Sequence, residues 1–168
     1  FYFSRERVES SARQLSNNFK LIENRDEIKD KYDEVFGDLT AEELALLNLD
    51  EHMWMWSRGV GYHHAGLAPI VKEFVEYLFL NKYIKFLFAT ETLALGINMP
   101  AKAIFIDRLH KYDGIKTRPI TQSEFLQLSG RAGRRGIDDK GYAFLSYDRS
   151  INKDWYSNLF TLKSSNLN

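Results

Sequence analysis

The sequence contains no cysteine among its 168 residues, which excludes a disulfide-stabilised scaffold and every metal site built on thiolates. No apolar run approaches the roughly 18 residues of a membrane-spanning helix, and no basic-then-apolar leader opens the chain. Neither sign of charge is in excess, since 23 basic residues offset 23 acidic ones. A surface that is basic all over and binds nucleic acid by its net charge is therefore excluded. The 44% of hydrophobic residues suffices for the core of one domain.

The balanced total conceals two segments of opposite charge. Residues 21–51 hold three basic and eleven acidic side chains, whereas residues 52–168 hold sixteen basic and ten acidic ones. Because salt screens charges beyond roughly 8 Å in physiological solution, we expect a polyanion to approach the second segment. On charge alone the alternative is that the two segments form solvent-exposed faces of opposite charge that bind no partner.

Strand-like and helical segments alternate along the chain. Residues 1–5 alternate like a strand, and apolar residues at helical spacing predict a helix over 5–19. An acidic excursion with marginal helix content follows over 23–38, and then a helix from a capping box at Thr40 to Gly59. The remaining expected strands are 60–63, 84–89, 103–106 and 142–145, and the remaining expected helices begin at Pro69 and Thr121. This alternation predicts an α/β fold with a mostly parallel sheet, in which 84–89 is buried on both faces.

Residues 127–136, Gln-Leu-Ser-Gly-Arg-Ala-Gly-Arg-Arg-Gly, are the strongest local signal. If residues 127–135 are helical, Gln127, Arg131, Arg134 and Arg135 project from neighbouring faces. Guanidinium groups so close repel one another unless an anion or carboxylates lie among them, and their planar forks suit phosphate. We therefore expect a polyphosphate clamp, with a solvated basic turn as the alternative.

A second candidate phosphate site begins where the strand over 84–89 ends. Thr90 and Thr92 offer hydroxyl donors where a helix can start, and Gly96 allows close approach of the backbone. Ligands of open α/β sheets bind beyond the carboxyl ends of the strands, and helix N-termini attract phosphate. The same residues also suit a plain helix cap.

Two further observations limit the chemistry. His63 and His64 are adjacent on an expected strand and therefore point to opposite faces, so we expect no metal there; one histidine should be buried and the other should meet solvent or phosphate. The sequence Gly-x-x-x-x-Gly-Lys-Ser/Thr is missing, so the chain cannot hydrolyse ATP alone by P-loop chemistry. It could supply half of such a site.

Four ordered blocks carry a family resemblance: residues 3–5, 63–67, 89–100 and 127–136. In this order they resemble motifs IV, IVa, V and VI in the second RecA-like lobe of superfamily 2 DExH-box helicases, most closely the superkiller type of exosome-associated RNA helicases. The resemblance covers residues 1–147 and implies a three-layer RecA-like domain. We expect this domain over 1–150, with an acidic excursion near 23–51, and a linker towards a winged helix over 151–168.

The resemblance also implies roles for single residues. Those expected to face ATP are Gly96, Asn98, Gln127, Arg131 and Arg134, with Arg134 as the arginine finger. Those expected to touch the nucleic-acid backbone are Arg5, His64, Gly66, Thr90 and Thr92. ATP and Mg²⁺ would be held mainly by a first lobe that precedes this chain, and the partner would be a single strand of nucleic acid, with RNA favoured.

The resemblance further implies an intracellular protein, cytoplasmic or nuclear, without a membrane partner. Two alternatives stay open: a non-catalytic nucleic-acid-binding module, and a protein-interaction module that keeps a helicase-like fold. The sequence does not distinguish RNA from DNA, and it assigns no role to Arg135 or to the acidic segment.

Overall fold

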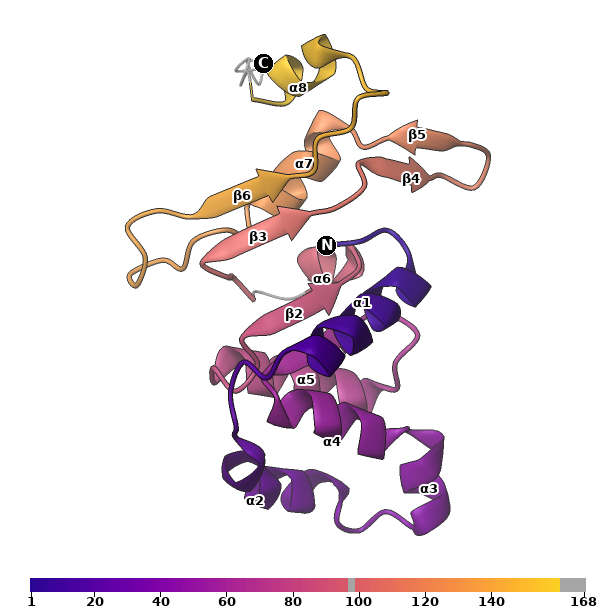
Figure 1. Ribbon diagram of the computed structural model, residues 1–168, viewed down its shortest axis with the longest axis vertical. Coiled ribbons are helices and arrows are strands. Elements are labelled where there is room, and N and C mark those ends of the chain that lie inside the picture. Colours follow the sequence, from indigo (N-terminus) through magenta and orange to yellow (C-terminus); the bar gives the residue numbers. More distant parts are fainter. Residues whose placement is uncertain (97–98, 161–168) are drawn as a thin grey trace. The chain divides into compact units, whose positions relative to one another are not determined.

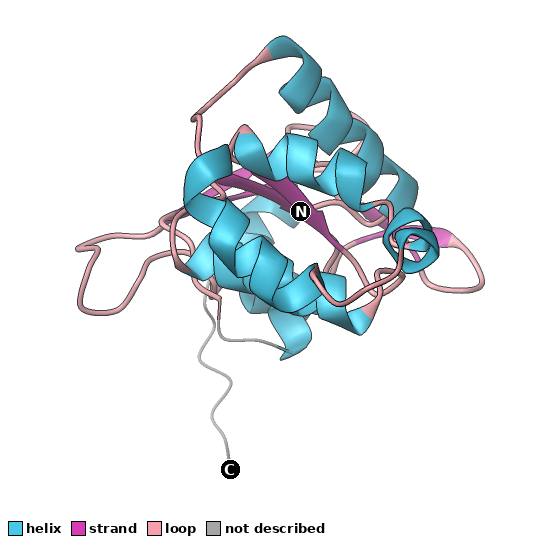
Figure 2. Cartoon of the chain, turned by 90° about the horizontal axis from the view of Figure 1, so that it is seen from below, coloured by secondary structure: helices cyan, strands magenta, loops and turns pink. Residues whose placement is uncertain are grey.

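The computed structural model describes residues 1–96 and 99–160 of the chain (Figure 1). The internal contacts divide the chain into two compact units, an N-terminal unit (Tyr2–Leu93) and a C-terminal unit (Phe1 with Ala94–Asn168). Helices predominate over strands (Figure 2). Within the described ranges, no helix combines the length and the apolar character that crossing a membrane requires.

The N-terminal unit is built on two parallel strands, β1 (Val60–His63) and β2 (Phe86–Ala89), with His63 opposite Ala89. Its helices are α1 (Arg5–Asn18), α2 (Arg25–Phe36), α3 (Ala41–Leu46), α4 (Leu49–Ser57) and α5 (Pro69–Leu80). Val8 of α1 packs with Met55 of α4 and Tyr62 of β1. The apolar stripe of α1 thereby holds the start of this helix near the strands.

The acidic segment departs from the sequence prediction. Residues 25–36 form the regular helix α2, and Ile28 and Phe36 are buried in the core with Phe74 of α5. These two residues and Tyr32 recur at helical spacing, which is sufficient for packing even though the other positions are mostly charged. The acidic side chains therefore form the outer face of a packed helix.

The helix expected from Thr40 to Gly59 is two helices. Thr40 and Glu43 form the predicted capping box at the start of α3, and Gly59, with a φ of 82°, ends the segment as predicted. Asn48 has a φ of 52°, so the backbone turns there before α4 begins. Asparagine tolerates this left-handed conformation better than most residues, and the break separates α3 from α4.

His52 of α4 lies in the core, with only 2% of its surface exposed. Its ring stacks on Trp56, with centroids 5.1 Å apart, and lies 4.8 Å from the ring of Tyr62. Burial lowers the pKa of His52 to about 4, since the charged form would lose its hydration. At neutral pH the ring is therefore an uncharged part of the aromatic core.

This burial predicts a pH-dependent stability. Below pH 6.5 the unfolded chain protonates His52 while the folded chain does not, so stability present above pH 6.5 is lost as the pH falls towards 4. We expect His52 to account for about 2 kcal/mol of the stability lost between pH 7 and pH 5. Urea unfolding of the wild type and of His52→Phe at both pH values measures this share. An equal pH dependence in the two proteins would contradict it.

The C-terminal unit contains a second parallel pair, β3 (Ala103–Ile106) with β6 (Tyr142–Leu145), in which Ile106 lies opposite Leu145. The other elements are the hairpin β4 (His110–Tyr112) and β5 (Thr117–Pro119), with helices α7 (Gln122–Ser129) and α8 (Lys153–Phe160). Thr121 and Glu124 form the second predicted capping box. The two parallel pairs confirm the predicted α/β class.

Three smaller predictions differ from the structure. Residues 1–4 form no strand, because Ser4 caps α1 by accepting a hydrogen bond from the Arg7 N–H. In β2 only Ala89 is buried, and Phe86 is 46% exposed, so this strand is not covered on both faces. The expected linker contains helix α8, in which Leu159 is buried. The domain bounds at 1–150 and 151–168 stay a prediction.

Candidate functional site

The carboxyl ends of β1 and β2 lie at one edge of their parallel pair. His64 follows β1 directly and Thr90 follows β2, and the Thr90 N–H donates to the His63 carbonyl oxygen at 3.2 Å. Parallel pairing thus brings together two residues that are 26 positions apart in the chain. This edge is where ligands of α/β sheets commonly bind.

His64 is held at both ring nitrogens. Its Nε2 lies 2.7 Å from Oε1 of Glu9, and its Nδ1 accepts the Gly66 N–H at 3.0 Å. Only 5% of His64 is exposed, and His63 is equally buried against Glu76. Neither ring meets solvent, because each has a carboxylate partner on a neighbouring helix; the alternative, that one of them meets phosphate, stays a prediction.

Arg5 and Gly66 are in close contact beside His64. A Cβ atom on Gly66 would lie 3.1 Å from Nη1 of Arg5 and 3.0 Å from the His64 ring, so no side chain fits there without displacing both. Arg5 itself is exposed as the first residue of α1. A guanidinium group and the end of a strand thus meet around a glycine.

Thr90 and Thr92 complete this edge. Their Oγ1 atoms are 2.9 Å apart and share a hydrogen bond; Thr90 is buried and Thr92 is exposed. Helix α6 (Thr92–Gly96) has only five residues, too few to act as an anion-binding helix N-terminus. We call Arg5, His64, Gly66, Thr90 and Thr92 the strand-end cluster; all five belong to the N-terminal unit.

The predicted arginine surface has a different geometry. Helix α7 ends at Ser129, and Gly133 adopts a φ of 87°, so residues 131–135 form a turn and not the expected helix. Ala101 fixes this turn, because its N–H donates to the Arg131 carbonyl and its own carbonyl accepts the Gly133 N–H. We call residues 131–135 the arginine turn.

Arg134 is paired with a carboxylate that sequence reasoning missed. Its Nε and Nη2 donate to the two oxygens of Asp138, at 2.7 and 2.9 Å, and its backbone N–H donates to the same carboxylate at 3.0 Å. These bonds from Arg134 lower the pKa of Asp138 to about 2. Asp138 therefore fixes the orientation of the Arg134 fork and neutralises part of its charge.

The other predicted ATP-facing residues lie around the arginine turn or beyond the description. Arg131 donates through Nη2 to the carbonyl oxygen of Ala94, and Gln127 is exposed in the last turn of α7. Gly96 is the last residue of α6. Asn98 lies outside the described residues. The described part of the chain contains no group of three residues with metal-ligating side chains.

The chain matches one family model and several curated proteins. The model of the helicase conserved C-terminal domain matches residues 35–136. The exosome RNA helicase MTR4 of Mus musculus is 44% identical over 155 residues, which are 90% of this chain and 15% of that protein. A fission-yeast protein (Schizosaccharomyces pombe), described as an uncharacterized helicase, is 39% identical over 91% of this chain and 15% of its own length. The probable helicase HelY of Mycobacterium tuberculosis is 40% identical over 98% of this chain and 19% of its own length.

Proposed function

Since the chain belongs to the helicase conserved C-terminal domain family, whose fold is RecA-like, we propose that it is the second motor lobe of an ATP-dependent RNA helicase. The chain spans about 15% of the length of the first relatives it matches, so the activity belongs to a longer protein with further domains. We propose that these include a first RecA-like lobe and a winged helix.

The observation that carries this proposal is the gathering of the strand-end cluster at one edge of β1 and β2. A guanidinium group on Arg5, threonine hydroxyls and the backbone at Gly66 are all groups that contact phosphate and sugar in nucleic-acid complexes. Contacts of this kind to phosphate and sugar carry no sequence information. We therefore assign the cluster to the backbone of a single strand, with little dependence on sequence.

The arginine turn has the second role in the proposal. ATP, the substrate, would be bound with Mg²⁺ mainly by the first lobe, and Gly96, Asn98, Gln127, Arg131 and Arg134 would face it from this chain. The turn suits a polyphosphate because it carries three guanidinium groups on a backbone fixed by Ala101. Arg134 would stabilise the charge that develops during phosphoryl transfer, as an arginine finger does.

Hydrolysis and movement are then coupled through the closure of the two lobes. Phosphoryl transfer is catalysed mainly by positioning and electrostatic stabilisation, so bringing the arginine turn to the nucleotide completes the site. Release after hydrolysis would let the lobes separate while the strand-end cluster keeps hold of phosphates. Alternation of the two states would move the protein along the strand.

We infer RNA as the substrate because three of the relatives are described as RNA helicases, and we infer an intracellular location for the same reason. A non-catalytic nucleic-acid-binding module is the second candidate, because the strand-end cluster requires no nucleotide. The discriminating observation is a P-loop upstream in the full-length protein, which only the motor requires.

We expect the chain alone to bind single-stranded RNA weakly and with a shallow salt dependence. Counterion release is counted per phosphate that a cation neutralises, and Arg5 supplies the guanidinium group of the strand-end cluster, so we expect a slope of log Kd against log salt of about 0.7 in magnitude. Fluorescence anisotropy with labelled oligouridine and oligoadenine of equal length measures the affinity for each sequence and its dependence on salt concentration. A strong preference for one of the two sequences would contradict recognition through the backbone.

A further inference from the structure

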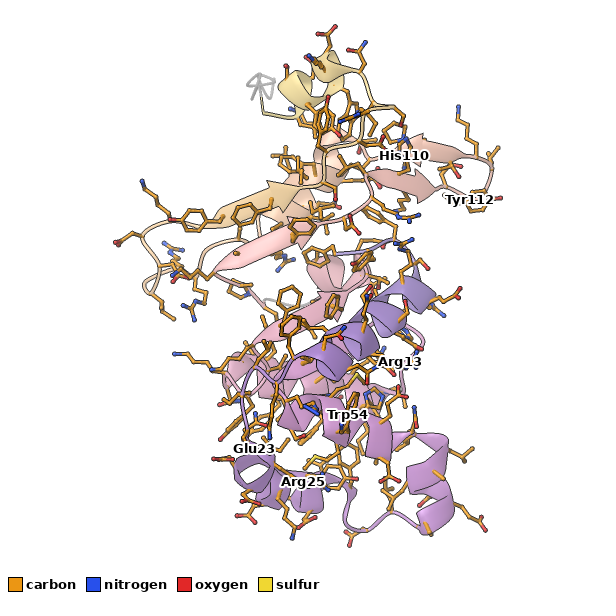
Figure 3. The ribbon with its side chains drawn as sticks, viewed as in Figure 1. Arg13, Glu23, Arg25, Trp54, His110 and Tyr112 are labelled. Carbon is orange, nitrogen blue, oxygen red and sulfur yellow. The ribbon has the colours of Figure 1, made fainter. Side chains whose placement is uncertain are left out.

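Glu9 connects helix α1 to the strand-end cluster. Its Oε1 lies 2.7 Å from Nε2 of His64, and its Oε2 lies 3.2 Å from Nη2 of Arg13. Arg13, which is labelled in Figure 3, in turn donates through Nε to Glu51 of α4 at 2.9 Å. The carboxylate is thereby fixed at both oxygens, and it in turn fixes the histidine.

The two contacts of the His64 ring determine which of its nitrogens carries the proton in the neutral form. The Gly66 N–H donates to Nδ1, so Nδ1 carries a lone pair and no proton. In the neutral ring the proton then resides on Nε2, where it is donated to Glu9. Burial acts to raise the pKa of Glu9, but the bonds from His64 and Arg13 hold it below its usual value, so the acceptor is a carboxylate at neutral pH.

We propose that Glu9 is a positioning residue for nucleic-acid binding, which it serves by holding the His64 ring in the orientation in which Nδ1 accepts the Gly66 N–H. This inference rests on the proposed function of the strand-end cluster. Glu9 contacts no nucleic acid itself. It acts through His64.

The packing explains why the orientation of one ring matters. A Cβ atom added to Gly66 would lie 3.0 Å from the His64 ring and 3.1 Å from Nη1 of Arg5, so the ring forms one side of the space beside this glycine. Rotation of the ring would break the Gly66 N–H bond and remove one wall of this packing. Without Glu9, nothing at Nε2 among the described contacts opposes that rotation, so the backbone at Gly66 would lose its fixed position in the turn after β1.

The direction in which the affinity changes when Glu9 is replaced distinguishes a positioning role from simple charge repulsion. Removing a carboxylate near a polyanion reduces repulsion and should strengthen binding. A positioning role predicts the opposite for Glu9→Ala: about tenfold weaker binding, on the scale of a lost charge-assisted hydrogen bond. Glu6, an exposed residue of the same helix, supplies the matched control, and Glu6→Ala should bind at least as tightly as the wild type.

The conservative variant tests the mechanism. Glu9→Gln keeps an oxygen that accepts the Nε2–H, so it should bind within about twofold of the wild type. Anisotropy with labelled oligouridine on the 168-residue chain gives the affinities. Nitrogen-15 shifts of the His64 ring give its tautomer, which should remain Nε2–H in Glu9→Gln and become mixed in Glu9→Ala. Thermal unfolding of each variant separates these effects from loss of the fold.

The outcomes distinguish this inference from the proposed function. If the wild type binds oligouridine and His64→Ala weakens binding while Glu9→Ala does not, the role of Glu9 is overturned and the proposed function stands. An unchanged tautomer in a folded Glu9→Ala also overturns it. If the wild type does not bind oligouridine, the proposed function fails, and the inference fails with it.

Discussion

Replacing Arg134 with alanine should lower ATP turnover by the full-length protein at least about a hundredfold, at the modest end of arginine-finger effects. Asp138 accepts from Nε and Nη2 and so holds the guanidinium group in one orientation, from which the Nη1 donors can meet developing charge. An interaction confined to the transition state acts on kcat and little on substrate binding. Steady-state ATPase assays beside direct nucleotide titration measure the two effects separately.

Two further variants make this prediction specific. Arg134→Lys should restore turnover only in part, because an ammonium group cannot reproduce the planar fork. Arg135→Ala removes an exposed arginine from the same turn and should leave turnover close to that of the wild type. Near-normal turnover in Arg134→Ala would mean that its pair with Asp138 is structural and that the catalytic assignment is wrong.

Replacing Gly141 with alanine should disrupt the arginine turn itself. A Cβ at this position would lie 2.4 Å from the carbonyl carbon and oxygen of Ala132 and 2.5 Å from the nitrogen of Gly133. These are backbone atoms, so the turn must move as a whole. We expect a loss of stability of about 3 kcal/mol, as for severe overpacking, and a loss of turnover as large as that of Arg134→Ala.

Gly136 provides the control for this substitution. Its φ of 78° strains any other residue, but nothing lies within 4 Å of an added Cβ. Gly136→Ala should therefore cost only the backbone strain, about 1 kcal/mol, and should retain most of the turnover. Urea unfolding and ATPase assays on both variants make the comparison. Equal effects of the two substitutions would show that backbone strain, and not the contact with Ala132, limits this turn.

Local signals in the sequence predicted local structure well. The capping boxes at Thr40 and Thr121 and the helix start at Pro69 are confirmed, because each depends on groups a few residues apart. The arginine helix was wrong for an equally local reason. Helix α7 ends at Ser129, before the arginines, and Gly133 beyond it adopts a positive φ that is incompatible with a helix. Because glycine adopts both helical and positive-φ conformations, the sequence alone did not distinguish a helix from a turn here.

The acidic helix α2 shows how composition misleads. Its charged residues suggested an excursion, whereas Ile28, Tyr32 and Phe36 form a stripe at intervals of four residues that packs on Phe74. The burial of the stripe outweighs the polarity of the outer face. The spacing was available in the sequence, so a weighting of periodicity over composition would have predicted the helix.

The partners of the candidate site differ in how far they could be predicted. Asp138 is four residues beyond Arg134, a spacing at which charged residues commonly pair. Glu9 is 55 residues from His64, and only the packing of α1 beside β1 brings them together. No local pattern encodes that packing. Sequence reasoning therefore named the residues that we propose bind nucleic acid and missed the residue that we propose positions His64.

Release of phosphate from ATP, measured side by side for the purified chain and the full-length protein, tests most directly whether this chain is one half of a motor. Both proteins are assayed with and without single-stranded RNA. We predict no turnover by the chain under either condition, because it has no P-loop, and RNA-stimulated turnover by the full-length protein. Turnover by the chain alone that survives removal of contaminating ATPases would contradict the account.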